Sequence, residues 1–272
     1  MKTTDELNNV VPSDADQPTS ETAIYSERRH VVIYGYTKKE LSNIIRHFKS
    51  QLPDFVKMTF ETANLVTHIT LSGTYTGLEM LRYKMNQYQQ HLSNLFSEEL
   101  ITQSNKTVSQ ILGELLAERE LTVSCAESCT GGNLAHRITQ QAGSSTYFLG
   151  SVVSYSNEVK ANVLGVERNT IGRHGAVSRE VAEEMSAGVA RLMKSDCAIS
   201  TTGIAGPDGG SKFKPVGTVW ISVKYCSQIV SECIHFKGDR NEVIESASNH
   251  GMVMLIKLLR NSYVAQEDIS DD

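Results

Sequence analysis

A short stretch of small and polar residues, Ala-Glu-Ser-Cys-Thr-Gly-Gly at 126–132, lies between an apolar run and an amphipathic one and is the strongest single indication of the fold. Before it, residues 121–124 have the character of a short strand. After it, Leu134 and Ile138 lie four residues apart on one face of a predicted helix. A strand therefore turns sharply into a helix at this point, as in domains in which strands and helices alternate.

The residues at this turn allow two interpretations. The free N–H groups of the first helical turn, and the positive end of its dipole, would point at whatever lies at the turn. Gly131 and Gly132 would let a ligand approach the backbone, with Cys129 and Thr130 beside it. Ser128 could attack a carbonyl group as a nucleophile or serve only as a helix cap. The stretch alone does not decide between an active site and a cap.

Length and composition allow one large folded unit or two smaller ones. The 272 residues, 40% hydrophobic and 21% charged, supply the core of one large or two modest domains. Residues 1–28 are rich in Asp, Glu, Ser, Thr, Asn and Pro, so we expect a disordered tail. A small domain at 29–98 and a larger one at 106–262 follow, joined by a polar connector. An acidic, solvated tail is expected at 263–272.

The small domain is predicted to be α+β. An apolar run at 31–34 is a strand, and Thr37 with Glu40 forms a capping box for the helix that follows. Strands are expected at 55–60 and 65–71, the second because apolar and polar residues alternate along it. A longer helix with apolar residues at helical spacing ends the unit. The expected order is β-α-β-β-α.

The larger domain is predicted to be a three-layer α/β domain with a mixed sheet. Apolar runs alternate with amphipathic helices, two of which begin after the caps Ser156 and Ser178, and a long helix closes the domain. The further strands are expected at 147–155, 197–201, 216–224 and 229–236. Alternation with helices predicts parallel pairing, whereas the last two strands are adjacent in the chain and pair antiparallel. Ligands collect at the carboxyl ends of strands in such sheets.

Charge, cysteine content and hydropathy exclude several classes of protein. A formal net charge of −5 argues against a protein that lies along nucleic acid or anionic lipid, because such binding relies on clustered Lys and Arg. The five cysteines lack paired CxxC spacing, so neither a disulfide framework nor a zinc site is predicted. No signal-like segment begins the chain, and no run approaches the roughly 18 apolar residues of a membrane span. We expect a soluble, cytoplasmic protein that needs no metal or cofactor.

Ser128 would act as a nucleophile only if a base took its proton. Lys160 lies five residues after Tyr155, so a strand that ends at Tyr155 and turns into a helix would direct both side chains toward one pocket. A desolvated lysine has a lowered pKa and could accept the proton, with the Tyr155 phenol relaying or orienting it. His136 and His174 lie near the candidate site segments and could also serve as the base, but each is more typical of a residue on a helix surface or in a turn. A surface lysine beside a packed tyrosine is the alternative.

A second candidate loop, Thr-Gly-Ile-Ala-Gly-Pro-Asp-Gly-Gly at 202–210, follows a predicted strand. Its four glycines suit a backbone that approaches a ligand or an oxyanion. No Gly-Lys-Ser/Thr follows it, and no G-x-G-x-x-G opens a helix, so this is neither a Walker loop nor a dinucleotide-binding fingerprint. A plain turn between two strands is the alternative.

Taken together, these stretches resemble the CinA C-terminal domain family. The resemblance covers residues 106–260 with its motifs in the family's order: AESCTGG at 126–132, GSS at 143–145, YSNEVK at 155–160, HGAVS at 174–178, GIAGPDGG at 203–210, KPVGTV at 214–219 and GDR at 238–240. The region at 30–98 resembles, more weakly, the small KH-type domain that precedes this one in full-length CinA proteins. The large molybdopterin-binding-like domain of those proteins does not occur in this sequence, so its pyrophosphatase activity is not expected.

The resemblance implies an activity, because the characterised members of the family are nicotinamide-nucleotide amidases. It implies hydrolysis of nicotinamide mononucleotide to nicotinic acid mononucleotide and ammonia, with Ser128 as nucleophile and Tyr155 and Lys160 as the activating pair. The substrate-binding positions that it implies are Cys129, Thr130, Gly131, Gly132, Thr202, Gly203, Gly206 and Arg240. The expected partners are the nucleotide substrate and further copies of the chain, as a dimer or higher homo-oligomer.

One position departs from the family. An arginine commonly follows Arg240 by four residues, and this chain has Ile244 there. The first alternative is therefore a catalytically weak or inactive CinA-like protein that binds nucleotides or regulates. A second is RNA binding through the small domain, since KH domains clamp backbone nucleotides with a GxxG loop. No GxxG occurs between His30 and Ser97, which disfavours nucleic acid as a partner.

Overall fold

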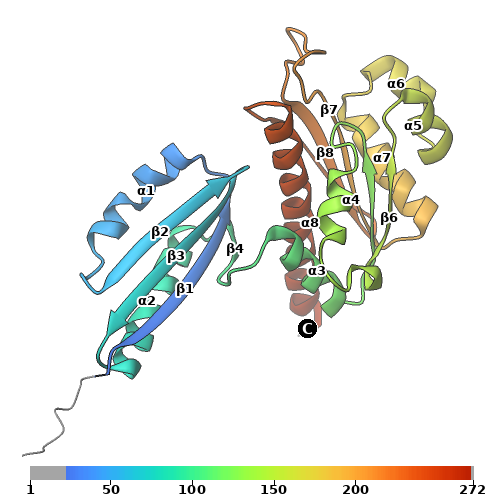
Figure 1. The fold of residues 1–272 in the computed structure, drawn as a ribbon. Helices are drawn as coiled ribbons and strands as arrows, with labels where there is room; N and C mark the ends of the chain where they lie inside the picture. The colour runs from blue at the N-terminus through green and yellow to red at the C-terminus, as the bar shows by residue number, and fades with distance from the viewer. Residues whose placement is uncertain (1–22, 271–272) are drawn as a thin grey trace, which may run out of the picture.

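The computed structural model describes residues 23–270, with side chains as far as residue 262. Most of the tail expected at 1–28 lies outside the described residues, but its end does not, because the first strand already begins at Tyr25. The last helix runs on to Ser270, well past the point at which we expected a solvated tail to begin. Two folded units lie side by side, one at each end of the described chain (Figure 1).

The first unit is a four-stranded antiparallel sheet with both helices packed on one face. Its elements are β1 (Tyr25–Tyr34), α1 (Lys38–Ser50), β2 (Val56–Ala63), β3 (Val66–Tyr75), α2 (Leu78–Leu95) and β4 (Leu100–Thr102). The strand order is β2-β3-β1-β4, the βαββαβ arrangement of ferredoxin-like units. The predicted β-α-β-β-α order was wrong in one respect: β4 lies within the stretch that we expected to be a polar connector. The resemblance to a KH-type domain stays a prediction.

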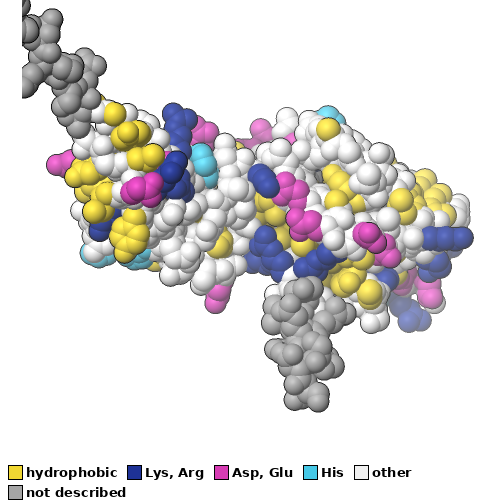
Figure 2. All heavy atoms as spheres, turned by 90° about the horizontal axis from the view of Figure 1, so that it is seen from below, with side chains coloured by type: hydrophobic (Ala, Val, Ile, Leu, Met, Phe, Trp, Pro, Cys, Tyr) yellow, Lys and Arg dark blue, Asp and Glu magenta, His cyan; other side chains and the backbone are white. Residues whose placement is uncertain are grey.

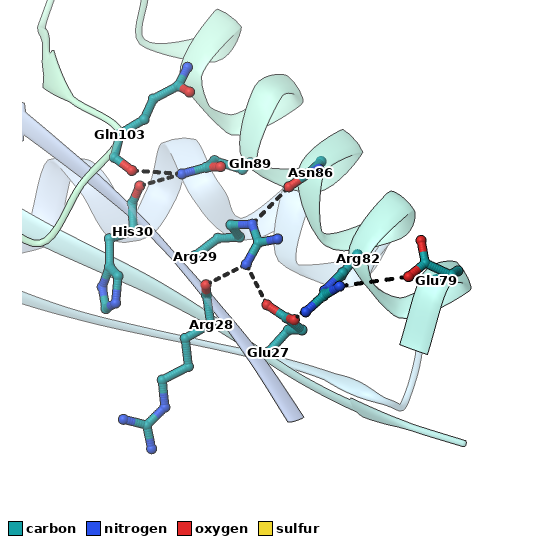
Figure 3. A network of polar contacts seen from close by, with 9 residues as sticks. All are labelled: Glu27, Arg28, Arg29, His30, Glu79, Arg82, Asn86, Gln89 and Gln103. Atoms are coloured by element: carbon teal, nitrogen blue, oxygen red, sulfur yellow. Dashed lines mark hydrogen bonds and ion pairs between the residues drawn. The ribbon is translucent and has the colours of Figure 1, made fainter. Parts of the chain in front are cut away.

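Local signals in the sequence account for much of this unit. Thr37 and Glu40 form the predicted capping box at the start of α1, each side chain accepting from the other residue's backbone N–H. A polar network then ties β1 to α2 on the surface (Figure 3). In it, Arg29 donates to Asn86 and Gln89 donates to the carbonyl oxygen of His30. These contacts hold α2 along the sheet.

The second unit is a three-layer α/β domain, as predicted. Its elements are α3 (Val108–Glu118), β5 (Val123–Glu127), α4 (Asn133–Thr139), β6 (Phe148–Val153), α5 (Asn157–Leu164), α6 (Arg168–His174), α7 (Arg179–Met193), β7 (Cys197–Gly203), β8 (Thr218–Tyr225), β9 (Gln228–His235) and α8 (Arg240–Ser270). The sheet order is β6-β5-β7-β8-β9. Helices α3, α4 and α8 share a hydrophobic cluster with one face of the sheet, and α5 and α7 share another.

The sheet is mixed because β5 pairs parallel with both β6 and β7, whereas β8 and β9 pair antiparallel. The chain leaves β5 for β6 on one side and then crosses to β7 on the other side. The carboxyl ends of β5, β6 and β7 therefore meet at one edge of the sheet, with a crossover on each side of β5. This is where open α/β sheets bind ligands.

The first unit packs against α8 of the second through the end of β1. Val32 and Tyr34 share the hydrophobic cluster that α8 forms with the larger sheet. The Tyr34 hydroxyl lies 3.0 Å from Nδ1 of His250, and Asn249 donates to the carbonyl oxygen of Asn64. On the face seen from below, positive and negative side chains are interspersed over both units (Figure 2).

Candidate active site

The three stretches singled out in the sequence line one hollow at the carboxyl edge of the larger sheet. Its volume is about 280 Å³. Ser128 and Cys129 come from the turn after β5, Tyr155 and Lys160 from the segment after β6, and the loop after β7 closes the far wall. Among the predicted site residues, those that line it are Ser128, Cys129, Tyr155, Lys160, Thr202, Gly203, Gly206 and Arg240.

Lys160 and Ser128 form the reactive pair of this hollow. Nζ of Lys160 donates a 2.9 Å hydrogen bond to Oγ of Ser128 and a 2.7 Å hydrogen bond to the carbonyl oxygen of Ser154. The lysine side chain is 1% exposed, and no carboxylate among the described residues accepts from it. Burial lowers the pKa of Lys160 because the charged ammonium loses its water. The amine can thus be neutral, and so act as a base, nearer to physiological pH.

The local sequence explains how Lys160 reaches Ser128. Ser156 caps α5 by accepting from the backbone N–H of Val159, so the helix starts directly after the end of β6. Lys160 lies in the first turn of that helix, and its buried side chain reaches Ser128. The nucleophile turn is held in place by the backbone N–H of Ser128, which donates to the carbonyl oxygen of Thr201 on β7. Strand ends therefore position both groups.

Cys129 and the two histidines are poor substitutes for these groups. Cys129 is buried, and its burial raises the pKa of the thiol to about 12. Almost no thiolate would exist at neutral pH. His136 bonds with Gln140 on the surface of α4, and His174 lies 3.5 Å from Glu180. Neither histidine lines the hollow.

Tyr155 and Arg240 lie together at the mouth of the hollow. The Tyr155 side chain is 63% exposed, and its hydroxyl accepts from Nη2 of Arg240 at 3.3 Å. Nη1 of Arg240 donates to the carbonyl oxygen of Gly206 at 2.7 Å. Among the hydrogen bonds of the described residues, none joins Tyr155 to Lys160 or Ser128. Its part in an activating pair stays a prediction.

Three backbone N–H groups at the start of α4 do not point into the hollow as we expected. The backbone N–H groups of Gly132, Leu134 and Ala135 donate to the side chain of Glu127 instead. Thr130 donates to the same carboxylate. Thr130, Gly131 and Gly132 do not line the hollow, and their part in substrate binding stays a prediction.

Glu127 is the residue that sequence reasoning missed. It is fully buried at the end of β5, directly before Ser128. The signal was an acidic residue at the last position of an apolar strand, followed by the small residues of a turn. Such a carboxylate is buried only where several donors meet it.

The loop after β7 has the properties predicted from its glycines. Gly206 and Gly209 both have φ +90°, a conformation that side chains with a Cβ rarely adopt. Thr202 donates to the carbonyl oxygen of Ala176, which joins the loop to the segment before α7. A second hollow of about 610 Å³ adjoins the first and shares Ala205, Gly206 and Arg240 with it. A ligand could therefore extend past Arg240.

Ile244 lies one turn after Arg240 on α8 and lines neither hollow. It is half-buried and packs against the core that α8 shares with the sheet. Within residues 23–270 there is no cluster of metal-ligating side chains and no helix long and apolar enough to cross a membrane. Cytoplasmic location and a homo-oligomeric state stay predictions.

Comparisons with known proteins match the second unit throughout. The profile of the CinA C-terminal domain matches residues 105–259. A CinA-like protein of Flavobacterium psychrophilum is 36% identical over 234 residues, which is 86% of this chain and 56% of that protein. A putative competence-damage inducible protein of Moorella thermoacetica is 45% identical over 154 residues, which is 57% of this chain and 37% of that protein. The chain spans about half the length of the curated relatives that it matches.

Solved structures of CinA proteins also match this chain. A CinA superfamily protein from Klebsiella pneumoniae superimposes with a TM-score of 0.55 and 36% identity, and the match covers 57% of this chain and 99% of that one. A competence/damage inducible protein from Agrobacterium tumefaciens gives a TM-score of 0.54 at 34% identity, with 58% of this chain and 99% of that one covered. The three-layer fold is thus shared with the family.

Proposed function

The chain belongs to the CinA C-terminal domain family, and from that premise we propose that it is a nicotinamide-nucleotide amidase. It would hydrolyse nicotinamide mononucleotide to nicotinic acid mononucleotide and ammonia. The observation that carries the proposal is the buried lysine whose Nζ lies 2.9 Å from Oγ of Ser128. A serine paired with a desolvated amine is an activated nucleophile for acyl transfer. The choice of nicotinamide mononucleotide as the substrate rests on the resemblance of the sequence motifs to those of the family.

The first half of the reaction would form an acyl-enzyme. Oγ of Ser128 attacks the carboxamide carbon while Nζ of neutral Lys160 takes the hydroxyl proton. The resulting oxyanion is held by backbone N–H groups at Cys129 or Gly203, which line the hollow beside Ser128. The tetrahedral intermediate then collapses, and its amino group takes a proton and leaves as ammonia. Lys160, now an ammonium, is the nearest proton donor on the enzyme.

The second half would release the acid. Water enters where ammonia left and attacks the ester carbon, and neutral Lys160 accepts a proton from that water. Oγ of Ser128 leaves and is protonated again by the lysine. Over the full cycle one water is consumed and one ammonia is released, so the enzyme returns to its starting state. None of these steps requires a group that the chain does not supply.

The rest of the nucleotide would extend toward Arg240. With the carboxamide at Ser128, the ribose and phosphate lie along the loop after β7, whose glycines allow close approach of the backbone. Arg240 lines both hollows and can form charge-assisted hydrogen bonds with a phosphate. Asp208 lines the first hollow and would accept from ribose hydroxyls.

Ammonia release tests the proposed function. We expect the purified protein to release ammonia from nicotinamide mononucleotide in equal amounts with nicotinic acid mononucleotide, measured by a coupled ammonia assay and by chromatography of the products. Nicotinamide alone serves as the control, because it has the scissile amide without the ribose and phosphate. Tight binding of the nucleotide without any ammonia would instead favour a binding or regulatory protein.

The phenol of Tyr155 provides a separate prediction. A substrate phosphate would draw the Arg240 guanidinium away from the phenol, which would free the hydroxyl to turn toward the leaving amino group. Tyr155→Phe keeps the ring and removes the hydroxyl, so we expect kcat to fall by about 10²-fold with little change in KM. A loss confined to KM would place the hydroxyl on the binding side and contradict its part in proton transfer.

Ile244 provides another prediction. An arginine at this position would lie one turn from Arg240, so we expect Ile244→Arg to lower KM for nicotinamide mononucleotide by up to about tenfold, a gain of about 1.4 kcal/mol in binding. The value of kcat should stay unchanged, because the phosphate is remote from the amide. Ile244→Met controls for lost packing. Nicotinamide riboside, which lacks the phosphate, should show no change, and an equal effect on both substrates would contradict a phosphate contact.

A further inference from the structure

Glu127 is buried in the most heavily hydrogen-bonded position of the site, although it does not face the substrate hollow. Its side chain is 0% exposed. Oε2 accepts from the hydroxyl of Thr130 at 2.8 Å and from the backbone N–H groups of Gly132 and Leu134 at 2.9 and 3.0 Å. Oε1 accepts from the backbone N–H of Ala135 and from the hydroxyl of Ser151, each at 3.0 Å.

These donors come from both sides of the nucleophile. Thr130 and the three N–H groups belong to the turn and the helix that follow Ser128, whereas Ser151 lies on the neighbouring strand β6. The Thr130 hydroxyl also lies 2.7 Å from that of Thr201 on β7. One carboxylate thus ties the nucleophile turn to β6 directly and to β7 through Thr130.

The backbone of Glu127 leads to the base as well. Its carbonyl oxygen accepts from the backbone N–H of Ser154 at 2.8 Å. The carbonyl oxygen of Ser154 in turn accepts from Nζ of Lys160 at 2.7 Å, and the same Nζ reaches Ser128. Glu127 is therefore connected through hydrogen bonds to both members of the reactive pair, while its side chain contacts neither.

We propose that Glu127 is the positioning residue of the site, which holds Ser128 within reach of Lys160 by fixing the turn that follows the nucleophile. This proposal rests on the proposed function, because the reaction that Glu127 would assist is the attack of Ser128 activated by Lys160. Reacting groups that move by about 1 Å can lose on the order of 10² in rate, so the precision of this turn matters for turnover. Substitution of a residue that acts in this way changes kcat but does not change the pKa of the base, Lys160.

Glu127→Gln is the variant that tests the proposal. The amide nitrogen would occupy the Oε1 position, where the Ser151 hydroxyl can reverse and accept, but the N–H of Ala135 would lose its acceptor. We expect kcat for ammonia release to fall 10- to 100-fold, on the scale of misplaced reacting groups, with KM within about threefold of wild type. The apparent pKa on the acid side of the pH profile should not move, because the Glu127 side chain does not contact Lys160.

Two further variants separate positioning from stability. Thr107→Ala removes a capping box from α3, far from the hollow, and should lower Tm by a few degrees with no change in kcat. Ser151→Ala removes a single donor to Glu127 and should fold even where Glu127→Gln does not. Its effect on kcat should be smaller, and largely absent once Glu127 is already changed, since the two belong to one network. A Glu127→Gln protein with lower Tm and wild-type kcat would overturn the proposal.

The reactivity of Ser128 toward diisopropyl fluorophosphate distinguishes this proposal from the proposed function. Phosphorylation of Ser128, followed by mass spectrometry, needs the activated serine but no amide substrate. Slow labelling of Glu127→Gln beside fast labelling of wild type supports the positioning role, even if no nucleotide yields ammonia and the proposed function falls. Equal labelling of both proteins overturns the positioning role alone. No labelling of either protein overturns both.

Discussion

Ser128→Ala is expected to lower kcat for ammonia release by at least about 10³-fold, the scale seen when a nucleophile that acts together with its base is removed. The reason is that no neighbour can replace it. The thiol of Cys129, the nearest alternative, has a pKa raised to about 12 by burial, so it is almost entirely protonated at neutral pH. Steady-state ammonia release over a range of substrate concentrations measures the loss.

The fold and substrate binding should survive the same substitution. Lys160 keeps its hydrogen bond to the carbonyl oxygen of Ser154, so the lost hydroxyl should cost only about 1 kcal/mol of stability. Calorimetric titration with nicotinamide mononucleotide should give a Kd close to that of wild type. Ser124→Ala, which removes a buried hydroxyl from β5, the strand directly before Ser128, is the matched control and should keep kcat. If Ser128→Ala retains more than a tenth of wild-type kcat, Ser128 is not the nucleophile.

The larger domain could be predicted from the sequence because its signals are local and repeated. Apolar runs alternate with amphipathic helices, and the caps Ser156 and Ser178 mark helix starts that the structure confirms. The strand β4 could not be predicted in this way. It has only three residues, Leu100–Thr102, and it is a strand because β1 pairs with it. A strand this short, which exists only through pairing with a neighbouring strand, has no alternation of apolar and polar residues that could be detected in the sequence.

The pairing of Ser128 with Lys160 was predictable because both follow strand ends that meet at one edge of the sheet. The role of Glu127 was not, because it depends on a hydroxyl from β6 and on the direction of the helix that follows the turn. The local pattern of glycines and free N–H groups is the same whether an outside ligand or the chain's own carboxylate accepts from them. Only the three-dimensional structure decides between these two acceptors.

The position of Arg240 shows a different limit. It lies 85 residues from Tyr155 in the chain, yet the two side chains meet at the mouth of the hollow. No spacing rule connects them, so only the resemblance of motifs indicated that Arg240 belongs to the site. The same comparison indicated a missing arginine at Ile244, and the structure places that residue against the core and outside the lining of both hollows.

Lys160 gives the second large effect. Lys160→Arg and Lys160→Met should each lower kcat/KM by about 10²- to 10⁴-fold, the range for loss of a general base. Arginine keeps the positive charge but stays protonated, so it cannot accept the serine proton. Methionine keeps much of the side-chain volume without any titrating group. Comparing the two separates loss of the base from loss of packing, and an active Lys160→Arg enzyme would show that no neutral amine is needed.

The pH dependence follows from the direction of the pKa shift. Burial lowers the pKa of Lys160 in the folded protein, so kcat/KM should rise with pH through a value below the roughly 10.4 of a free lysine and then level off. Between the lowered pKa of Lys160 in the folded protein and the pKa of a free lysine, the unfolded chain binds about one more proton at this side chain than the folded chain does. The free energy of unfolding should therefore rise with pH across the same window, and this slope should be shallower in Lys160→Met. Denaturant titrations at a series of pH values measure it. If the unfolding free energies of wild type and Lys160→Met change equally with pH, Lys160 titrates like a free lysine. Its amine would then be a charged ammonium at pH 7 to 8, and Ser128 would have no base.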